Sequence, residues 1–308
     1  MGQGLTPGPF LHRWRGWGFL CYNVDLLEKI IGLDIGGSGT GFVVMDEGGR
    51  VYFRGFWPLS RWDDPGAIAR RVSDIAYFDA VGIGAAGAWT PEERMRLAEA
   101  FKRCGKRIRV ISDAEAALIG AFTGKPGIIV IAGTGSVAIG MGKGGKLVRA
   151  GGFGHLFGDK GSGFWIAKEA ISSALEAIEG LGNMTRLTSL LEGEPREFVL
   201  SLMKTDSVRR VSSLAPKVIQ IAEEGDETAL RIIGEGLRHL VGLAKAIISK
   251  TGYVPVSYHG GLFGSSFYLN RFKEMCALEG LEVREPEQSG AWGAAWVAGE
   301  ATGPSGQI

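Results

Sequence analysis

The chain of 308 residues contains only three cysteines, Cys21, Cys104 and Cys276, and no CxxC pair. A disulfide framework and a cysteine zinc site are therefore not indicated, and isolated thiols favour a reducing cytoplasm. No apolar run reaches the roughly 18 residues that a membrane-spanning helix needs. Lysine plus arginine number 34 and aspartate plus glutamate 33, so the charge balance gives no reason to expect nucleic acid or an anionic membrane as a partner.

Glycine, in contrast, is abundant. The 50 glycines are about twice the usual share, and they gather at the ends of expected strands, which favours tight turns and close contacts between backbone and ligand. The length and the apolar content of 45% suit two globular domains. Residues 1–28 begin with a turn-rich stretch, and we expect an N-terminal extension without a catalytic part.

The first domain is expected to open as an antiparallel meander of three strands. Residues 30–35 form an apolar strand that carries Asp34, and glycine turns at 36–40 and 47–50 separate it from strands at 41–46 and 51–56. Alternating helices and strands then predict an α/β unit with a mixed sheet: helix 65–77, strand 80–84, a helix from Pro91, strand 107–111 and helix 114–122.

The same pattern recurs 96 residues later. The turn at 37–40 corresponds to Gly-Thr-Gly-Ser at 133–136, and the second turn at 48–50 corresponds to Gly-Gly-Lys at 144–146. Two turns at one fixed offset predict duplicated half-domains that face each other across a cleft. Val130 stands where Asp34 stands in the first copy, so the two loops are expected to have different duties.

The remaining chain is expected to be largely helical, and its last helix to pack back on the first domain. We predict domains at 29–123 and 124–308. The expected elements are helices at 164–178, 207–224, 226–250, 267–279 and 291–301, and strands at 254–259 and 281–284.

Two aspartates are the candidates for chemistry. Asp34 directly precedes a loop of glycines and hydroxyls, and a carboxylate beside phosphates is tolerated when Mg²⁺ lies between them. Asp113 follows a strand at the end where open α/β sheets bind ligands. It is either the base that accepts a proton from an attacking hydroxyl or only a helix cap, and Ser112 is able to supply that cap instead.

Five motifs together resemble the N-acetylglucosamine kinase and archaeal hexokinase family, which also contains the ATPase activators of 2-hydroxyacyl-CoA dehydratases and benzoyl-CoA reductase. That group belongs to the superfamily of actin, sugar kinases and the heat-shock ATPase domain. The motifs, in the order of the family, are Asp-Ile-Gly-Gly-Ser at 34–38, Ser-Asp-Ala at 112–114, Ala-Gly-Thr-Gly-Ser at 132–136, the run from Gly152 to Ser162, and Gly-Gly-Leu-Phe-Gly-Ser at 260–265.

The resemblance implies an α/β fold of two ribonuclease-H-like domains, with mixed five-stranded sheets flanked by helices and an ATP cleft between them. ATP and Mg²⁺ are the implied cofactors. Asp113 is the implied catalytic base, and Asp34 is the implied metal-binding residue. The residues implied to bind ATP are Gly36, Gly37, Ser38, Gly133, Thr134, Gly135, Gly260, Gly261 and Ser265. Those implied to contact the sugar are Asp113, Gly152, Phe153, Gly154 and Asp159.

Two departures from the family concern the sugar. The loop at 58–64 lacks the Asn that similar kinases use to bind the sugar, and Lys160 replaces the Glu of the usual Asp-Glu-Gly-Ser motif. The expected activity is transfer of the γ-phosphate of ATP to a hydroxyl of a hexose or N-acetylhexosamine. The expected partner is a small sugar, with neither nucleic acid nor membrane, and a homodimer is left open.

Other members of the superfamily supply the alternatives. An ATPase of the dehydratase-activator type needs cysteines for a [4Fe–4S] cluster early in the second domain, and no cysteine lies between Cys104 and Cys276. A repressor-type relative would carry a cysteine-rich zinc motif and a helix-turn-helix, and the chain has neither. A nucleotide-binding scaffold similar to actin would not need an acid at position 113.

Overall fold

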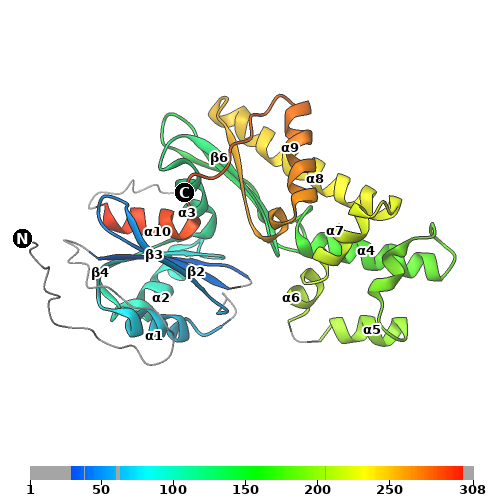
Figure 1. Cartoon of the computed structure of the whole chain (residues 1–308), viewed down its shortest axis with the longest axis horizontal. Helices are drawn as coiled ribbons and strands as arrows, with labels where there is room; N and C mark the ends of the chain where they lie inside the picture. The colour runs from blue at the N-terminus through cyan, green and yellow to red at the C-terminus, as the bar shows by residue number, and fades with distance from the viewer. Residues whose placement is uncertain (1–28, 38, 60–62, 205, 301–308) are drawn as a thin grey trace, which may run out of the picture.

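The computed structural model describes residues 29–37, 39–59, 63–204 and 206–300. It has the predicted α/β architecture, in which two mixed sheets are each flanked by helices (Figure 1). The expected N-terminal extension at 1–28 and the predicted site residue Ser38 lie outside these ranges. Within the ranges, every helix is too short or too polar to cross a membrane.

The first sheet has the strand order β3-β2-β1-β4-β5. Strands β1 to β3 form the expected antiparallel meander, and β4 and β5 run parallel to β1. Helices α1 (Pro65–Ile75) and α2 (Pro91–Phe101) cover one face, and α3 (Asp113–Phe122) and α10 (Gly290–Gly299) lie on the other (Figure 1). The strands are β1 (Ile30–Ile35), β2 (Thr40–Met45), β3 (Val51–Trp57), β4 (Phe78–Ala85) and β5 (Gly105–Ser112).

The second sheet has the order β8-β7-β6-β9, with four strands rather than the five expected. The strand predicted at 281–284 is wrong: this segment forms an isolated parallel bridge between Val256 and Val283. Pro286 follows at once, and a proline has no N–H with which to extend a ladder. The strands are β6 (Gly127–Ala132), β7 (Ser136–Met141), β8 (Leu147–Gly151) and β9 (Val256–His259).

The internal repeat is present in the structure. Adding 96 to the bounds of β2 gives those of β7, and adding 96 to the first residue of β3 gives the first residue of β8. In each sheet the first strand of the meander also pairs in parallel with a later strand, β4 in one case and β9 in the other. Each copy therefore places a turn between its first two strands at the same edge of its sheet.

The helical part differs from the prediction in one place. The single helix predicted over 207–224 is wrong, because the chain breaks at 213–214 into α6 and α7. Pro216 lies in the first turn of α7, where its missing N–H is tolerated and would not be in a helix interior. The helices are α4 (Gly163–Ile178), α5 (Pro195–Leu202), α6 (Ser207–Ser212), α7 (Ala215–Glu223), α8 (Glu227–Thr251) and α9 (Ser266–Leu278).

Asp226 begins the longest helix, α8, and ties it to the insertion before it. Its carboxylate accepts hydrogen bonds from the backbone N–H of Ala229 at 2.9 Å and of Arg186 at 2.7 Å, and from the hydroxyl of Thr185 at 2.9 Å. Burial alone would raise the pKa of Asp226, but these hydrogen bonds outweigh it and hold the pKa below its usual range.

Asp226→Asn is expected to lower the free energy of unfolding by about 1–2 kcal/mol at neutral pH, because it removes the charge from these hydrogen bonds. The lowered pKa of the folded state means that the ionised carboxylate stabilises above the unfolded pKa, and that this stabilisation is lost as the pH falls through the folded pKa. Urea unfolding of both proteins at falling pH should therefore show the difference shrinking. A difference that stays constant with pH would exclude the charge as its cause.

Helix α3 joins the two sheets. It packs against β4 and β5 of the first sheet and against β6, β7 and β9 of the second. Its apolar residues share one buried cluster with Ile129 and Ile131 of β6 and Val137 and Ile139 of β7. The helix that begins at Asp113 is thus fixed from both sides.

Candidate active site

Asp34 lies near the end of β1, with its side chain 16% exposed. The first residue of α10, Gly290, approaches it so closely that a Cβ there would lie 2.6 Å from Asp34 Oδ2. Burial raises the pKa of Asp34 above its usual range, and the His259 imidazole partly offsets this. The N-terminus of α10 faces the carboxylate, and the positive end of a helix favours its ionised form.

His259 is a site residue that the sequence analysis missed. It ends β9, pairs in register with Ile131 of β6, and places Nε2 3.4 Å from Asp34 Oδ2. The two residues come from different sheets, so this contact joins the two halves of the chain. Nothing in the local sequence around His259 signals a partner 225 positions earlier.

The two glycine turns have compact backbones at the ends of β1 and β6. Gly36 N–H donates to the Gly39 carbonyl at 2.9 Å, and Gly133 N–H donates to the Gly135 carbonyl at 3.0 Å. The second turn also touches the start of α4, where Gly163 N–H donates to the Gly133 carbonyl at 2.8 Å. Glycine turns at a helix N-terminus suit the binding of an anion.

The segment after β9 lies directly beside the second turn. Gly260 has φ +107°, and a Cβ there would lie 2.5 Å from the Ala132 carbonyl oxygen, so only glycine fits. Gly261 and Ser265 line a cavity of about 320 Å³ that is open to solvent, and α7 forms its other wall. Its α7 residues, which the sequence analysis did not identify, are Pro216, Ile219, Gln220 and Glu223.

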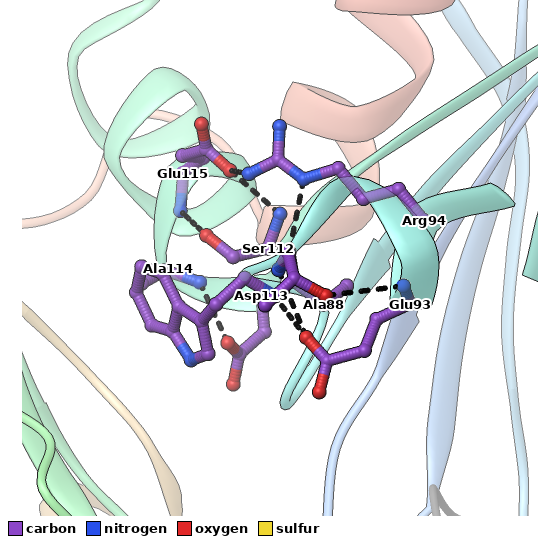
Figure 2. Close-up of polar contacts among 9 residues, drawn as sticks. Ala88, Glu93, Arg94, Ser112, Asp113, Ala114 and Glu115 are labelled. Atoms are coloured by element: carbon purple, nitrogen blue, oxygen red, sulfur yellow. Dashed lines mark hydrogen bonds and ion pairs between the residues drawn. The ribbon is translucent and has the colours of Figure 1, made fainter. Parts of the chain in front are cut away.

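Asp113 is the first residue of α3, and the helix cap is supplied by its neighbour. Ser112 Oγ accepts the Glu115 N–H at 3.1 Å, and the Glu115 carboxylate accepts the Ser112 N–H at 2.7 Å (Figure 2). Asp113 Oδ1 accepts the N–H of Ala114 at 2.9 Å. Because Ser112 caps the helix, capping does not explain the presence of an acid at position 113.

The predicted sugar segment follows β8. Gly152 and Gly154 have φ of +72° and +84°, and Phe153 between them is 69% exposed. The Arg149 guanidinium lies 5.3 Å from the Phe153 ring and 4.9 Å from the Trp89 ring. Trp89 packs on the buried cluster that α3 shares with the second sheet, so Arg149 links the sugar segment to the surroundings of Asp113.

Asp159 lies between the sugar segment and the second glycine turn. Its backbone has φ +54°, which is uncommon for a residue other than glycine. A Cβ on Gly135 would lie 2.6 Å from Asp159 Oδ2, so the carboxylate rests against that turn. The structure thus brings a predicted sugar contact beside a predicted phosphate loop.

The donor set near Asp34 fits Mg²⁺ rather than a metal caged by protein ligands. No group of three or more His, Cys, Asp or Glu side chains in the described ranges is arranged to hold a metal ion. Mg²⁺ is usually held by one or two carboxylates, water and phosphate oxygens, and a single carboxylate beside a glycine turn agrees with that pattern.

Comparison with known proteins identifies relatives over most of the chain. The model of the BadF/BadG/BcrA/BcrD ATPase family matches residues 31–298. An N-acetylmuramic acid/N-acetylglucosamine kinase of Clostridium acetobutylicum is 31% identical over 305 residues, which cover 88% of this chain and 98% of that protein. An N-acetyl-D-glucosamine kinase of Dictyostelium discoideum is 27% identical, and the match covers 76% of this chain and 85% of that protein.

Solved structures share the fold. A ROK family glucokinase of Streptomyces griseus, solved with glucose and AMPPNP, superposes with a TM-score of 0.59 at 21% identity, over 88% of this chain and 99% of its own. A candidate N-acetylglucosamine kinase of Chromobacterium violaceum superposes with a TM-score of 0.72 at 23% identity. The superposition covers 87% of this chain and 98% of that protein. At these identities the likeness establishes the two-domain fold.

Proposed function

Because the chain belongs to the BadF/BadG/BcrA/BcrD ATPase family, we propose that it is an ATP-dependent sugar kinase whose acceptor is an N-acetylhexosamine or a hexosamine. The family predicted from the five motifs is thereby confirmed. The observation that carries the activity is the 31% identity along 98% of an N-acetylmuramic acid/N-acetylglucosamine kinase. The family model, which matches residues 31–298, spans both glycine turns, Asp34 and Asp113.

The two glycine turns would hold the phosphates of ATP. The turns at 36–37 and 133–135 lie at the ends of equivalent strands, and the N–H groups of Gly36 and Gly133 close each turn from within. The cavity beside Gly261 and Ser265 is where the adenosine would lie, with α7 as its second wall.

Asp34 would hold Mg²⁺ together with the phosphates. The metal supplies charge neutralisation on the transferred phosphoryl group. His259 places an imidazole beside the same carboxylate, and Gly290 at the N-terminus of α10 lies close to it.

Asp113 would accept the proton of the attacking sugar hydroxyl. Phosphoryl transfer asks a protein mainly for positioning, charge neutralisation and one such base. Asp113 is fixed for this role by the capped first turn of α3 and by the packing of that helix against both sheets.

Gly152, Phe153, Gly154 and Asp159 would contact the sugar. Phe153 offers an exposed apolar ring that is able to pack against a pyranose face or an acetyl methyl group. Lys160, which stands where the family has Glu, lies over the Trp165 ring at 5.2 Å. Of the 58–64 loop that lacks the expected Asn, residues 60–62 lie outside the described ranges.

The alternatives from the sequence are weaker. An activator-type ATPase would need cysteines for its cluster, and Cys104 and Cys276 are buried free thiols. An actin-like scaffold would leave the acid at position 113 unexplained, since Ser112 already caps α3.

An assay of ADP release with glucose, glucosamine, N-acetylglucosamine, N-acetylmuramic acid and mannose tests the proposal. We expect kcat/KM for at least one amino sugar to exceed that for mannose by about tenfold or more, because a site that binds a substituent at C2 rejects a sugar lacking it. ADP release at the sugar-free rate with every sugar would contradict the kinase assignment, and equal rates with all sugars would contradict the amino-sugar preference.

A further inference from the structure

Arg94 and Glu115 form a buried ion pair next to the proposed base. Arg94 lies on α2 and Glu115 on α3, two residues after Asp113, and one guanidinium N–H of Arg94 donates to Glu115 Oε2 at 2.8 Å (Figure 2). The Glu115 side chain is only 6% exposed and that of Arg94 26%. This pair differs from an exposed ion pair, because taking both charges out of water costs free energy that their mutual attraction must offset.

Besides the ion pair, each of the two side chains forms a hydrogen bond with a backbone group. Glu115 Oε2 accepts the Ser112 N–H at 2.7 Å, and Arg94 Nε donates to the Ala88 carbonyl at 3.0 Å. The pair therefore connects the loop after β4, which contains Ala88, with the end of β5 and the first turn of α3 (Figure 2).

The loop on the far side of Arg94 is fixed as well. Glu93 accepts the N–H groups of Trp89 and Thr90 at 3.0 and 2.9 Å, in the capping box of α2. Trp89 then stacks with Arg149, which reaches the predicted sugar segment. The contacts run without a break from the sugar segment to the residue before Asp113.

We propose that Arg94 and Glu115 are positioning residues that hold Asp113 in line with the sugar hydroxyl. The inference rests on the proposed function, in which Asp113 is the base. The guanidinium binds two groups at the same time through different nitrogens: Nε donates to the Ala88 carbonyl, and a terminal N–H donates to the Glu115 carboxylate. A displacement of about 1 Å at a reacting group is enough to lower turnover roughly 100-fold.

Arg94→Met tests the proposal, with Arg96→Met as the matched control. Arg96 is exposed on the same helix and forms no hydrogen bond or ion pair within the described part of the chain. We expect Arg94→Met to lower kcat about 10- to 100-fold while the Kd for ATP stays within about twofold, and Arg96→Met to change neither. Equal kcat for the two variants would overturn the proposal.

One further variant separates positioning from folding. Arg94→Met leaves the Glu115 carboxylate buried without its cation, so Arg94→Met/Glu115→Gln, which removes that charge, should recover thermal stability. It should not recover kcat, because the bond to Ala88 is still missing. Recovery of kcat together with stability would show that the pair is only structural.

A double-mutant cycle with Asp113→Asn shows whether Arg94 acts through Asp113. In the Asp113→Asn background, Arg94→Met should lower kcat by less than about threefold, because the group it positions no longer accepts a proton. The full 10- to 100-fold loss in that background would contradict the proposal even with the kinase activity intact. Absence of sugar phosphorylation in the unmodified protein would instead contradict the proposed function.

Discussion

Asp113→Asn is expected to lower the rate of sugar phosphorylation by roughly 10²- to 10⁴-fold, the usual contribution of a general base. The variant should fold normally, because the cap of α3 is supplied by Ser112 and the amide keeps the size of the carboxylate. ATP binding should stay within about twofold, since the phosphate turns and the cavity beside Ser265 are formed by other residues.

Steady-state kinetics and calorimetric titration with ATP measure the two effects separately. Asp74→Asn is the control, because Asp74 is an exposed carboxylate of helix α1 outside the proposed site. Near-full turnover of Asp113→Asn would show that Asp113 is not the base. An equal fall in ATP affinity would mean that the residue holds the nucleotide instead.

Gly32→Val is expected to have the largest effect on stability. A Cβ at position 32 would lie 2.0 Å from the Ala291 carbonyl oxygen and 2.6 Å from the Ala295 Cβ, so any side chain there pushes α10 away from β1. Overpacking typically costs about 1–3 kcal/mol, and a collision with helix backbone belongs to the upper end of that range or beyond it. Because α10 also carries Gly290, the surroundings of Asp34 would be lost with it.

Gly41→Val is the matched control on the neighbouring strand. Nothing lies within 4 Å of a Cβ added at Gly41, and its backbone has no positive φ. Thermal and urea unfolding should show a loss of about 3 kcal/mol or more for Gly32→Val and less than about 1 kcal/mol for Gly41→Val. Similar stability of the two variants would contradict the tight docking of α10.

The sequence predicted those features that rest on local patterns. The offset of 96 residues predicted the two meanders, because each turn lies at a fixed distance from its strands. The helix predicted from Pro91 likewise begins at that residue, directly after the cap at Thr90. Asp34 became a candidate because it lies near the end of a strand just before a glycine turn, and Asp113 because it follows a strand and begins a helix.

Features that depend on tertiary contacts were not predictable in this way. The contact of His259 with Asp34 joins residues of two different sheets, and Arg94 meets Glu115 only because α2 and α3 flank neighbouring strands. No sequence motif marks the α7 residues that line the cavity, since Ile219 and Gln220 are ordinary helix residues. The roles assigned to the site residues stay predictions until the variants are measured.

The docking of α10 has a consequence for the order in which the chain is made. The first sheet is synthesised before the second, but the helix that covers one of its faces, α10, spans Gly290–Gly299 and follows every strand of both sheets. Until those residues leave the ribosome, the surface formed by Ile30, Val43 and Ala80 has no cover. The N-terminal half therefore waits for a helix that is synthesised after both sheets, and only then is the Asp34 environment complete.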